Sequence, residues 1–189
     1  MEILPFLIAP FLASLILTGI HAYLGVHVVE RGVIFVDLAL AQIAALGATI
    51  AILVGMDVHG SGAYWVSLAF TFLGAAIFAV VRTRTNHIPQ EAFIGIAYAV
   101  ASAAAILAMS KATGETEHLK DMLVGNILAV SYHDVERTAA LYGAIGLFHY
   151  LFRKKFLLIS TDPEEAERQG INIRLWDFLF YASFGFVVT

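Results

Sequence analysis

Long apolar stretches, each close to 20 residues, recur along this chain and restrict the class of fold that it can adopt. A helix rises about 1.5 Å per residue, so roughly 20 residues cross the 30 Å hydrocarbon core of a bilayer. Hydrophobic residues make up 60% of the chain and charged residues 14%, with a mean hydropathy of +0.82. Helices of soluble proteins need a polar face, which these stretches lack. The sequence therefore predicts an all-α, polytopic helical membrane protein.

The apolar stretches divide residues 1–189 into the spans of one transmembrane domain. We expect complete spans at 3–29, 33–56, 63–81, 92–110 and 135–152. The run 122–130 is too short to cross and contains Gly125 and Asn126, so we expect a re-entrant or half-spanning piece with these two residues as a gate. The last run, 176–189, is also too short to cross. We therefore expect a domain that is incomplete at its C-terminus.

Composition and short motifs exclude several functional classes. The net charge of −4 provides no basic surface for nucleic acid. Because the chain has no cysteine, it has no disulfide and no thiolate metal site. The motifs G-x-x-x-x-G-K-[ST], H-E-x-x-H and G-x-S-x-G are all missing, so there is no phosphate-binding loop, zinc protease site or nucleophile elbow. The first residues, MEILPFLIAP, lack the positive n-region of a signal peptide and are expected to remain as the first anchor.

The most polar run, STDPEEAERQGINIR, predicts a short helix at about 162–170. Asp162 can cap the first free N–H groups, and Pro163 suits the first helical position. Glu165 is expected to complete a capping box, and Gly170 offers a left-handed stop. We expect Glu164, Glu165, Glu167 and Arg168 to face water, and Ala166 and Ile171 to make a small apolar contact. Such a helix between membrane segments either docks a soluble partner or is only a solvated connecting loop.

The distribution of positive charge places this helix on the cytoplasmic side of the membrane. With the N-terminus outside and the run 122–130 re-entrant, most Lys and Arg residues lie inside. The inside set is Arg31, Arg82, Arg84, Arg153, Lys154, Lys155, Arg168 and Arg174, and the outside set is Lys111, Lys120 and Arg137. The reverse orientation gives a slightly poorer split and also places the helix in the cytoplasm.

We expect Asp37 to be the only carboxylate well inside an apolar segment, with Gln42 five positions later. Five positions turn a helix by about 140°, so the two side chains share only a broad face. An unpaired charge in a membrane is costly, so Asp37 is by default a candidate functional residue. The alternative is that Asp37 lies near the interface and pairs with Arg31. His21 and His27 lie deep in the first span and either touch a polar pathway or serve packing.

Three stretches carry a family resemblance: VVERGVIFVDLALAQIAALGATIA, DMLVGNILAVS, and STDPEEAERQGI with the apolar run after it. Taken together they resemble the permease subunits of bacterial ABC importers for zinc, manganese and iron, whose fold is similar to that of the vitamin B12 importer. The resemblance covers nearly the whole chain in the same order, and the last two stretches are its specific parts. It implies a multi-pass protein of the inner (plasma) membrane, surrounded by lipid and paired with a second permease copy.

The resemblance implies that the helix at 162–170 is a coupling helix, which sits in a groove of a separate ABC ATPase subunit. Its contact residues would be Asp162, Pro163, Glu164, Glu165, Ala166 and Gly170. ATP would bind to that partner and no cofactor to this chain, which would be a transport subunit and not an enzyme. An extracytoplasmic metal-binding protein would deliver the ion, and alternating access of two permease copies would move it.

The residues that would touch the ion depart from the pattern of the family. Metal importers of this group typically carry an Asp and, four residues later, a His in the second span, where this sequence has Leu38 and Gln42. Asp37 lies one residue early, about 100° around the helix. Gln42 is a weaker ligand for Zn²⁺ than imidazole. The expected substrate pathway is Asp37, Gln42 and His21, with Asp37 as a metal ligand, and the identity of the metal stays open.

A second class of function is an ion- or proton-coupled secondary transporter, in which Asp37 titrates and no ATPase is needed. Such carriers are typically built from inverted repeats with broken helices. The sequence shows no convincing internal symmetry of this kind. The ABC permease is therefore the main hypothesis, and the secondary transporter is the alternative.

Overall fold

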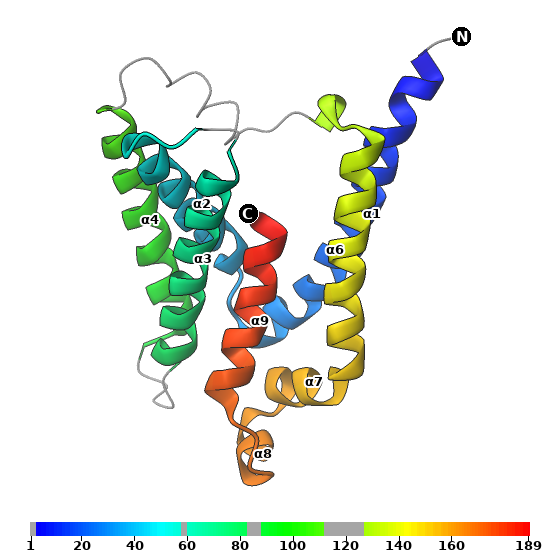
Figure 1. Cartoon of the computed structure of the whole chain (residues 1–189). Coiled ribbons are helices and arrows are strands. Elements are labelled where there is room, and N and C mark those ends of the chain that lie inside the picture. Colours follow the sequence, from blue (N-terminus) through cyan, green and yellow to red (C-terminus); the bar gives the residue numbers. More distant parts are fainter. Residues whose placement is uncertain (1–2, 58–59, 83–87, 112–126) are drawn as a thin grey trace.

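The structure is a computed structural model that describes residues 3–57, 60–82, 88–111 and 127–189 (Figure 1). Within these ranges every regular element is a helix, as the apolar stretches predict. Four of these helices are long and apolar enough to cross a membrane: Leu7–Arg31, Val36–Leu53, Ser61–Val81 and Gln90–Met109. The chain is therefore a multi-pass, all-α membrane protein.

The first four helices contain most of the apolar length of the chain. α1 covers Ile3–Arg31, α2 Val36–Leu53, α3 Ser61–Val81 and α4 Gln90–Met109. In Figure 1, α2, α3 and α4 form one bundle, while the N-terminal half of α1 lies apart from it, beside the later helix α6. Gly32, at a φ of +66°, follows α1 with a left-handed turn that favours glycine and leads into α2.

After residues 112–126, the described part of the chain continues with η1, Ile127–Ala129, and α6, Tyr132–Leu151. The end of α4 and the start of α6 lie at the same end of the molecule (Figure 1). α6 starts with a capping box, in which Ser131 Oγ accepts from the Asp134 N–H and Asp134 Oδ2 accepts from the Ser131 N–H. This cap defines where α6 enters the apolar layer.

Three consecutive helices complete the chain: α7 Arg153–Thr161, α8 Pro163–Arg168 and α9 Ile173–Val188. In Figure 1, α7 lies crosswise below α6, α8 is the lowest element, and α9 turns back upward between α3 and α6. α9 packs against α3 and α2. The chain thus descends in α6, turns at α8 and returns into the bundle in α9.

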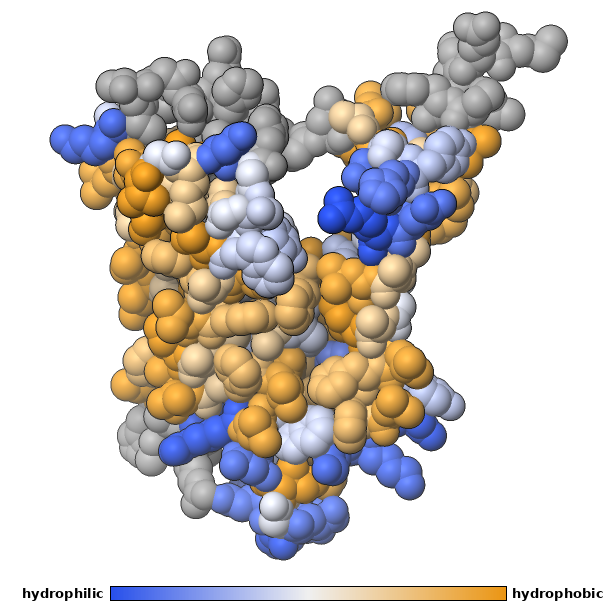
Figure 2. All heavy atoms as spheres, viewed as in Figure 1, coloured by the Kyte–Doolittle hydropathy of each residue, from blue (hydrophilic) through white to orange (hydrophobic). Residues whose placement is uncertain are grey.

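The surface of the molecule is apolar around its sides and polar at its ends. Figure 2 shows a broad apolar band over the helices, with hydrophilic residues gathered above and below it. The large hydrophobic side chains that are exposed on these helices include Leu73, Ile77, Val80, Ile96 and Leu107. This distribution is expected for helices whose sides face lipid and whose ends face water.

Small residues allow α2, α3 and α9 to approach one another closely. A Cβ added to Gly47 of α2 would lie 2.9 Å from the Cα of Ser67 on α3, and one added to Gly185 of α9 would lie 3.0 Å from Thr71 Cγ2. Ser67 Oγ also donates to the Ala44 carbonyl at 2.7 Å, so a hydrogen bond joins α2 and α3. Helices in lipid associate through such packing and hydrogen bonds, because lipid is as apolar as their side chains. These contacts hold α2 in the bundle.

Gly47→Ala is expected to destabilise the bundle, because the new methyl group would meet the backbone of α3 at Ser67. Overpacking of this kind costs about 1–3 kcal/mol. Gly143→Ala is the matched control, since an added Cβ at Gly143 of α6 has nothing within 4 Å and alanine favours a helix over glycine. The thermal unfolding midpoint in detergent measures both variants. A Gly47→Ala midpoint at or above that of the wild type would contradict the close contact of α2 with α3.

Candidate functional site

α8 is a short helix, and the residues that define its two ends are those predicted from the sequence. Asp162 Oδ1 accepts a hydrogen bond from the Glu165 N–H at 2.9 Å, and Pro163 is the first helical residue. Gly170 has a φ of +75°, a left-handed backbone that favours glycine, and it turns the chain toward α9. The cap, the proline and the glycine stop therefore lie where the sequence predicts them.

Glu165 does not close the expected capping box, so that prediction is wrong. The Asp162 N–H donates to the Leu158 carbonyl at 2.8 Å, because α7 runs directly into the cap residue and its last turn already uses this donor. The Glu165 carboxylate instead accepts from Gln169 Nε2 at 2.9 Å and from Arg168 Nη1 at 3.2 Å. Glu165 thus stabilises the C-terminal turn of α8 and not its start.

α8 presents a charged face to the outside of the molecule. Glu164, Glu167 and Arg168 are exposed, and α8 projects from the hydrophilic lower end (Figures 1 and 2). Ala166 is fully buried at 0% exposure, and Ile171 is half-buried. A small apolar contact therefore seats the helix on its own chain, while its polar face is open to another molecule.

Aromatic rings anchor the helices on either side of α8. Phe156 of α7 is fully buried and lies edge-on to Trp176 of α9, with 5.2 Å between the ring centroids. His149 of α6 stacks on Phe156 at a centroid distance of 4.2 Å, and its Nε2 hydrogen-bonds with Ser183 Oγ of α9 at 2.9 Å. α6, α7 and α9 thus meet in one aromatic cluster.

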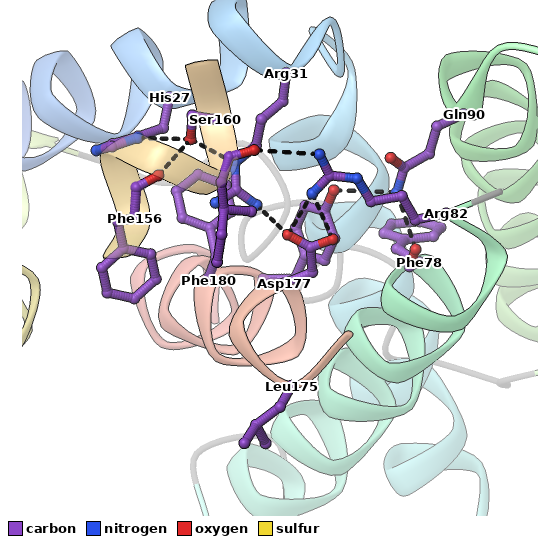
Figure 3. A network of polar contacts seen from close by, with 12 residues as sticks. His27, Arg31, Phe78, Arg82, Gln90, Phe156, Ser160, Leu175, Asp177 and Phe180 are labelled. Carbon is purple, nitrogen blue, oxygen red and sulfur yellow. Dashed lines mark hydrogen bonds and ion pairs between the residues drawn. The ribbon is translucent and has the colours of Figure 1, made fainter. Parts of the chain in front are cut away.

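A buried carboxylate beside these rings binds two arginines. Asp177 of α9 is 0% exposed; its Oδ1 accepts from Arg31 Nη1 at 2.6 Å, and its two oxygens accept from Arg82 Nη1 at 2.7 and 2.6 Å (Figure 3). The Arg31 side chain is 1% exposed and that of Arg82 is 19% exposed. Arg31 is the last residue of α1, and Arg82 is the C-cap of α3. One carboxylate therefore joins the ends of two helices to α9.

The same two arginines also contact α7, just before α8. Arg31 Nε donates to Ser160 Oγ at 2.9 Å, and Arg82 Nη2 donates to the Ile159 carbonyl at 3.3 Å. We call Arg31, Arg82, Ser160 and Asp177 the charged cluster. It connects α1, α3, α7 and α9 (Figure 3).

α4 and α2 are linked to this region by two neighbouring side chains. Gln90, the first residue of α4, donates through Nε2 to the Phe78 carbonyl of α3 at 2.9 Å (Figure 3). The same Nε2 donates to the Tyr181 hydroxyl of α9 at 3.1 Å. Glu91 Oε1 accepts from the Phe35 N–H at 2.9 Å, which satisfies a free donor at the start of α2. Side-chain hydrogen bonds thus tie the starts of α2 and α4 to their neighbours.

The structure contradicts the predicted alternative in which Asp37 pairs with Arg31. Arg31 forms its ion pair with Asp177, while Asp37 is half-buried in the first turn of α2 and accepts from the Leu38 N–H at 2.7 Å. The chain turns over residues 32–35 between the two helices, so nearness in sequence does not make a pair. Asp37 is also not the only carboxylate inside an apolar helix, because Asp177 lies within α9.

The three residues expected on a substrate pathway lie at different depths. Asp37 is in the first turn of α2, and Gln42 is half-buried farther along the same helix. His21 of α1 hydrogen-bonds through Nδ1 to the Leu17 carbonyl at 2.8 Å. Over the residues that the structure describes, no group of three or more His, Cys, Asp or Glu side chains is close enough to hold a metal ion. Two further expected site residues lie outside the described residues: Gly125 and Asn126.

Sequence reasoning missed the charged cluster, although a signal for it was present. Asp177 interrupts the apolar run of α9, and a carboxylate in such a place needs a cation. Charge counting assigns Arg31 and Arg82 only to the cytoplasmic surface, whereas the structure buries Arg31 almost completely. His27 is 2% exposed and hydrogen-bonds with Ser160 Oγ at 2.9 Å, which supports its interpretation as a packing residue.

Comparison with known proteins gives a family match over almost the whole chain. The model described as "ABC 3 transport family" matches residues 3–189. The manganese transport system membrane protein MntC of Listeria innocua is 27% identical over 176 residues, which are 93% of this chain and 59% of that protein. The chelated iron transport system membrane protein YfeD of Yersinia pestis is 27% identical over 126 residues, which are 63% of this chain and 41% of that protein. The chain thus spans less than two thirds of the length of either relative.

A solved structure has the same arrangement of helices. PsaBC from Streptococcus pneumoniae in complex with Fab matches with a TM-score of 0.72 and 24% sequence identity, over 97% of this chain and 64% of that chain. At this identity the likeness shows the fold. The family model, the shared fold and the apolar helices lead to one conclusion: this chain belongs to the ABC 3 transport family and is a multi-pass protein of the inner membrane.

Proposed function

We propose that the chain forms the membrane-spanning permease of an ATP-binding cassette importer for a divalent transition metal ion. The observation that carries the proposal is α8, a capped and exposed polar helix at one end of a bundle with the PsaBC fold. Relatives named for manganese and iron transport support a transition metal as the cargo. Family membership does not favour the alternative of a secondary transporter that uses Asp37.

The ATPase partner is expected to bind α8 from outside the bundle. The exposed side chains of Glu164, Glu167 and Arg168 offer it a polar surface, and buried Ala166 keeps the helix in place. The sequence contains no G-x-x-x-x-G-K-[ST] loop, so we expect ATP to bind to the partner and not to this chain. The chain is then a transport subunit without its own ATPase site.

The proposed mechanism is alternating access. ATP binding closes two ATPase subunits, the α8 helices move with them as rigid bodies, and two permease copies rock about a shared pathway. A homodimer of permeases in lipid is therefore part of the proposal. An extracytoplasmic metal-binding protein supplies the ion at the end of the bundle opposite α8.

The ion pathway is expected to follow α2. Asp37 lies in its first turn, close to the end of α1 that contacts α7, and Gln42 lies about 7.5 Å farther along the helix axis. His21 lies about 15 Å before the last residue of α1. A carboxylate oxygen is a hard ligand that suits Mn²⁺, whereas the Gln42 amide is neutral and weaker. This order makes Asp37 the expected ion contact nearest to the cytoplasmic exit.

The double variant Glu164→Lys/Glu167→Lys is expected to weaken binding of the ATPase subunit, because it reverses two exposed charges on α8. An exposed ion pair is worth about 0.2–1 kcal/mol, so reversing two charges should change the affinity by roughly tenfold. Glu136→Lys is the matched control, an exposed carboxylate near the start of α6 at the opposite end. Titration of the ATPase subunit against the full-length permease measures the affinity. Equal affinities for the double variant and the wild type would contradict docking at α8.

Asp37→Asn is expected to reduce uptake of the transported metal, because it removes the carboxylate charge and keeps the side-chain shape. Loss of one charged contact, worth about 1.5–3 kcal/mol, corresponds to a roughly ten- to hundredfold loss of affinity. Glu30→Gln is the matched control, an exposed carboxylate at the end of α1. Uptake of manganese, iron and zinc by cells that express the full-length importer measures both. Wild-type uptake of all three ions by Asp37→Asn would exclude this residue from the pathway.

A further inference from the structure

The Arg31–Asp177 pair at the centre of the charged cluster lies where water is excluded, so these two residues must remain together. Asp177 and Arg31 have side-chain exposures of 0% and 1%. A charge left unpaired in such a site is strongly unfavourable, and the attraction between paired charges is greater there than in water. The members of the cluster come from four helices or their caps. The cluster therefore opposes any movement of these helices relative to one another.

α8 is bounded on both sides by residues that belong to the cluster. Ser160 lies two positions before Asp162, the cap residue of α8, and its Oγ accepts from Arg31 Nε at 2.9 Å. Asp177 lies in the second turn of α9, the helix that follows α8. A displacement of α8 must therefore act on the cluster through both of its neighbours.

Arg31 also connects the charged cluster to the start of α2 along the chain. Only four residues separate it from Val36, the first residue of α2. The Phe35 N–H donates to Glu91 Oε1 at 2.9 Å, which fixes this turn to α4. Asp37, the expected ion contact, follows directly. The end of α1 that the cluster holds is thus connected by a short, fixed turn to the expected pathway.

We propose that the charged cluster transmits the movement of α8 to α1 and α3, with Asp177 as its central positioning residue. This inference rests on the proposed function, because it requires an ATPase that moves α8. Through Arg31, the movement of α8 reaches α1 and the start of α2. Through Arg82, it reaches α3. Asp177 touches neither the ion nor the ATPase, and it acts by keeping α7, α8 and α9 in one rigid body with the bundle.

The test uses the full-length permease with its ATPase subunits in proteoliposomes. Arg82→Gln leaves one arginine opposite Asp177, so the Arg31–Asp177 pair and the fold are expected to persist. Asp177→Asn removes the charge that binds both arginines. Both variants are expected to bind the ATPase subunits as the wild type does, because the exposed face of α8 is unchanged. The amount of metal transported per ATP hydrolysed is expected to fall by a factor of about 5 or more.

A distance measurement separates transmission of movement from stability of the fold. Residues 1–189 contain no cysteine, so within them a pair of spin labels attaches only to two introduced and exposed sites, Thr161→Cys at the end of α7 and Val80→Cys on α3. Any cysteine elsewhere in the full-length permease is replaced by serine. In the otherwise wild-type protein the distance between the labels is expected to stay constant when ATP is added. In Arg82→Gln it is expected to change, because α7 then moves without α3.

The outcomes distinguish this inference from the proposed function. Arg82→Lys keeps a cation opposite Asp177 and is expected to recover most of the coupling. Arg82→Gln would overturn the inference if it transported as much metal per ATP as the wild type and kept a constant label distance. If Asp177→Asn does not assemble, the results for Arg82→Gln are sufficient to test the inference. A wild-type protein that neither binds an ATPase nor moves a metal would instead overturn the proposed function.

Discussion

The ion pairs of one buried carboxylate, Asp177, determine how the lower end of this molecule is built. Burial of a charge is costly unless it is paired, and breaking a buried pair costs about 3–5 kcal/mol. Because Asp177 is 0% exposed and its partners end α1 and α3, those two helices must finish where α9 begins. Both arginines also stand at helix C-termini, where a cation is favourable. The two arginines that pair with Asp177 also donate hydrogen bonds to α7, the helix that precedes α8.

α8 depends on this arrangement because it is too short to be stable alone. A helix of six residues does not repay the cost of nucleation in water. Asp162 and Gly170 define its ends, Ala166 is buried against the chain, and α7 and α9 hold it on both sides. The exposed pair of Arg168 with Glu164, at 3.6 Å, adds little to stability. The Glu164 charge on the outer face of α8 is thus of little consequence for the fold.

Two kinds of contact hold the rest of the bundle, each in the environment that suits it. In the apolar layer, glycines such as Gly47 and Gly185 bring α2, α3 and α9 into close contact, since lipid provides no hydrophobic force between helices. Near the lower end, polar side chains such as Gln90 and Glu91 connect helix starts to their neighbours. The bundle is consequently packed through small residues in its apolar layer and is joined by ion pairs at the end that carries α8.

The sequence by itself determined the membrane class, the apolar character of α1 to α4 and the ends of α8, because each depends on residues within a few positions of one another. It also led to the family through three local stretches, which the match over 3–189 agrees with. It did not reveal the ion pairs of Asp177, whose partners lie 95 and 146 positions away, and one of the two alternatives that it left open for Asp37, a pair with Arg31, was wrong. Only the tertiary structure decided these pairs, because the partner of a buried charge depends on where helices end in space and not on their spacing in sequence.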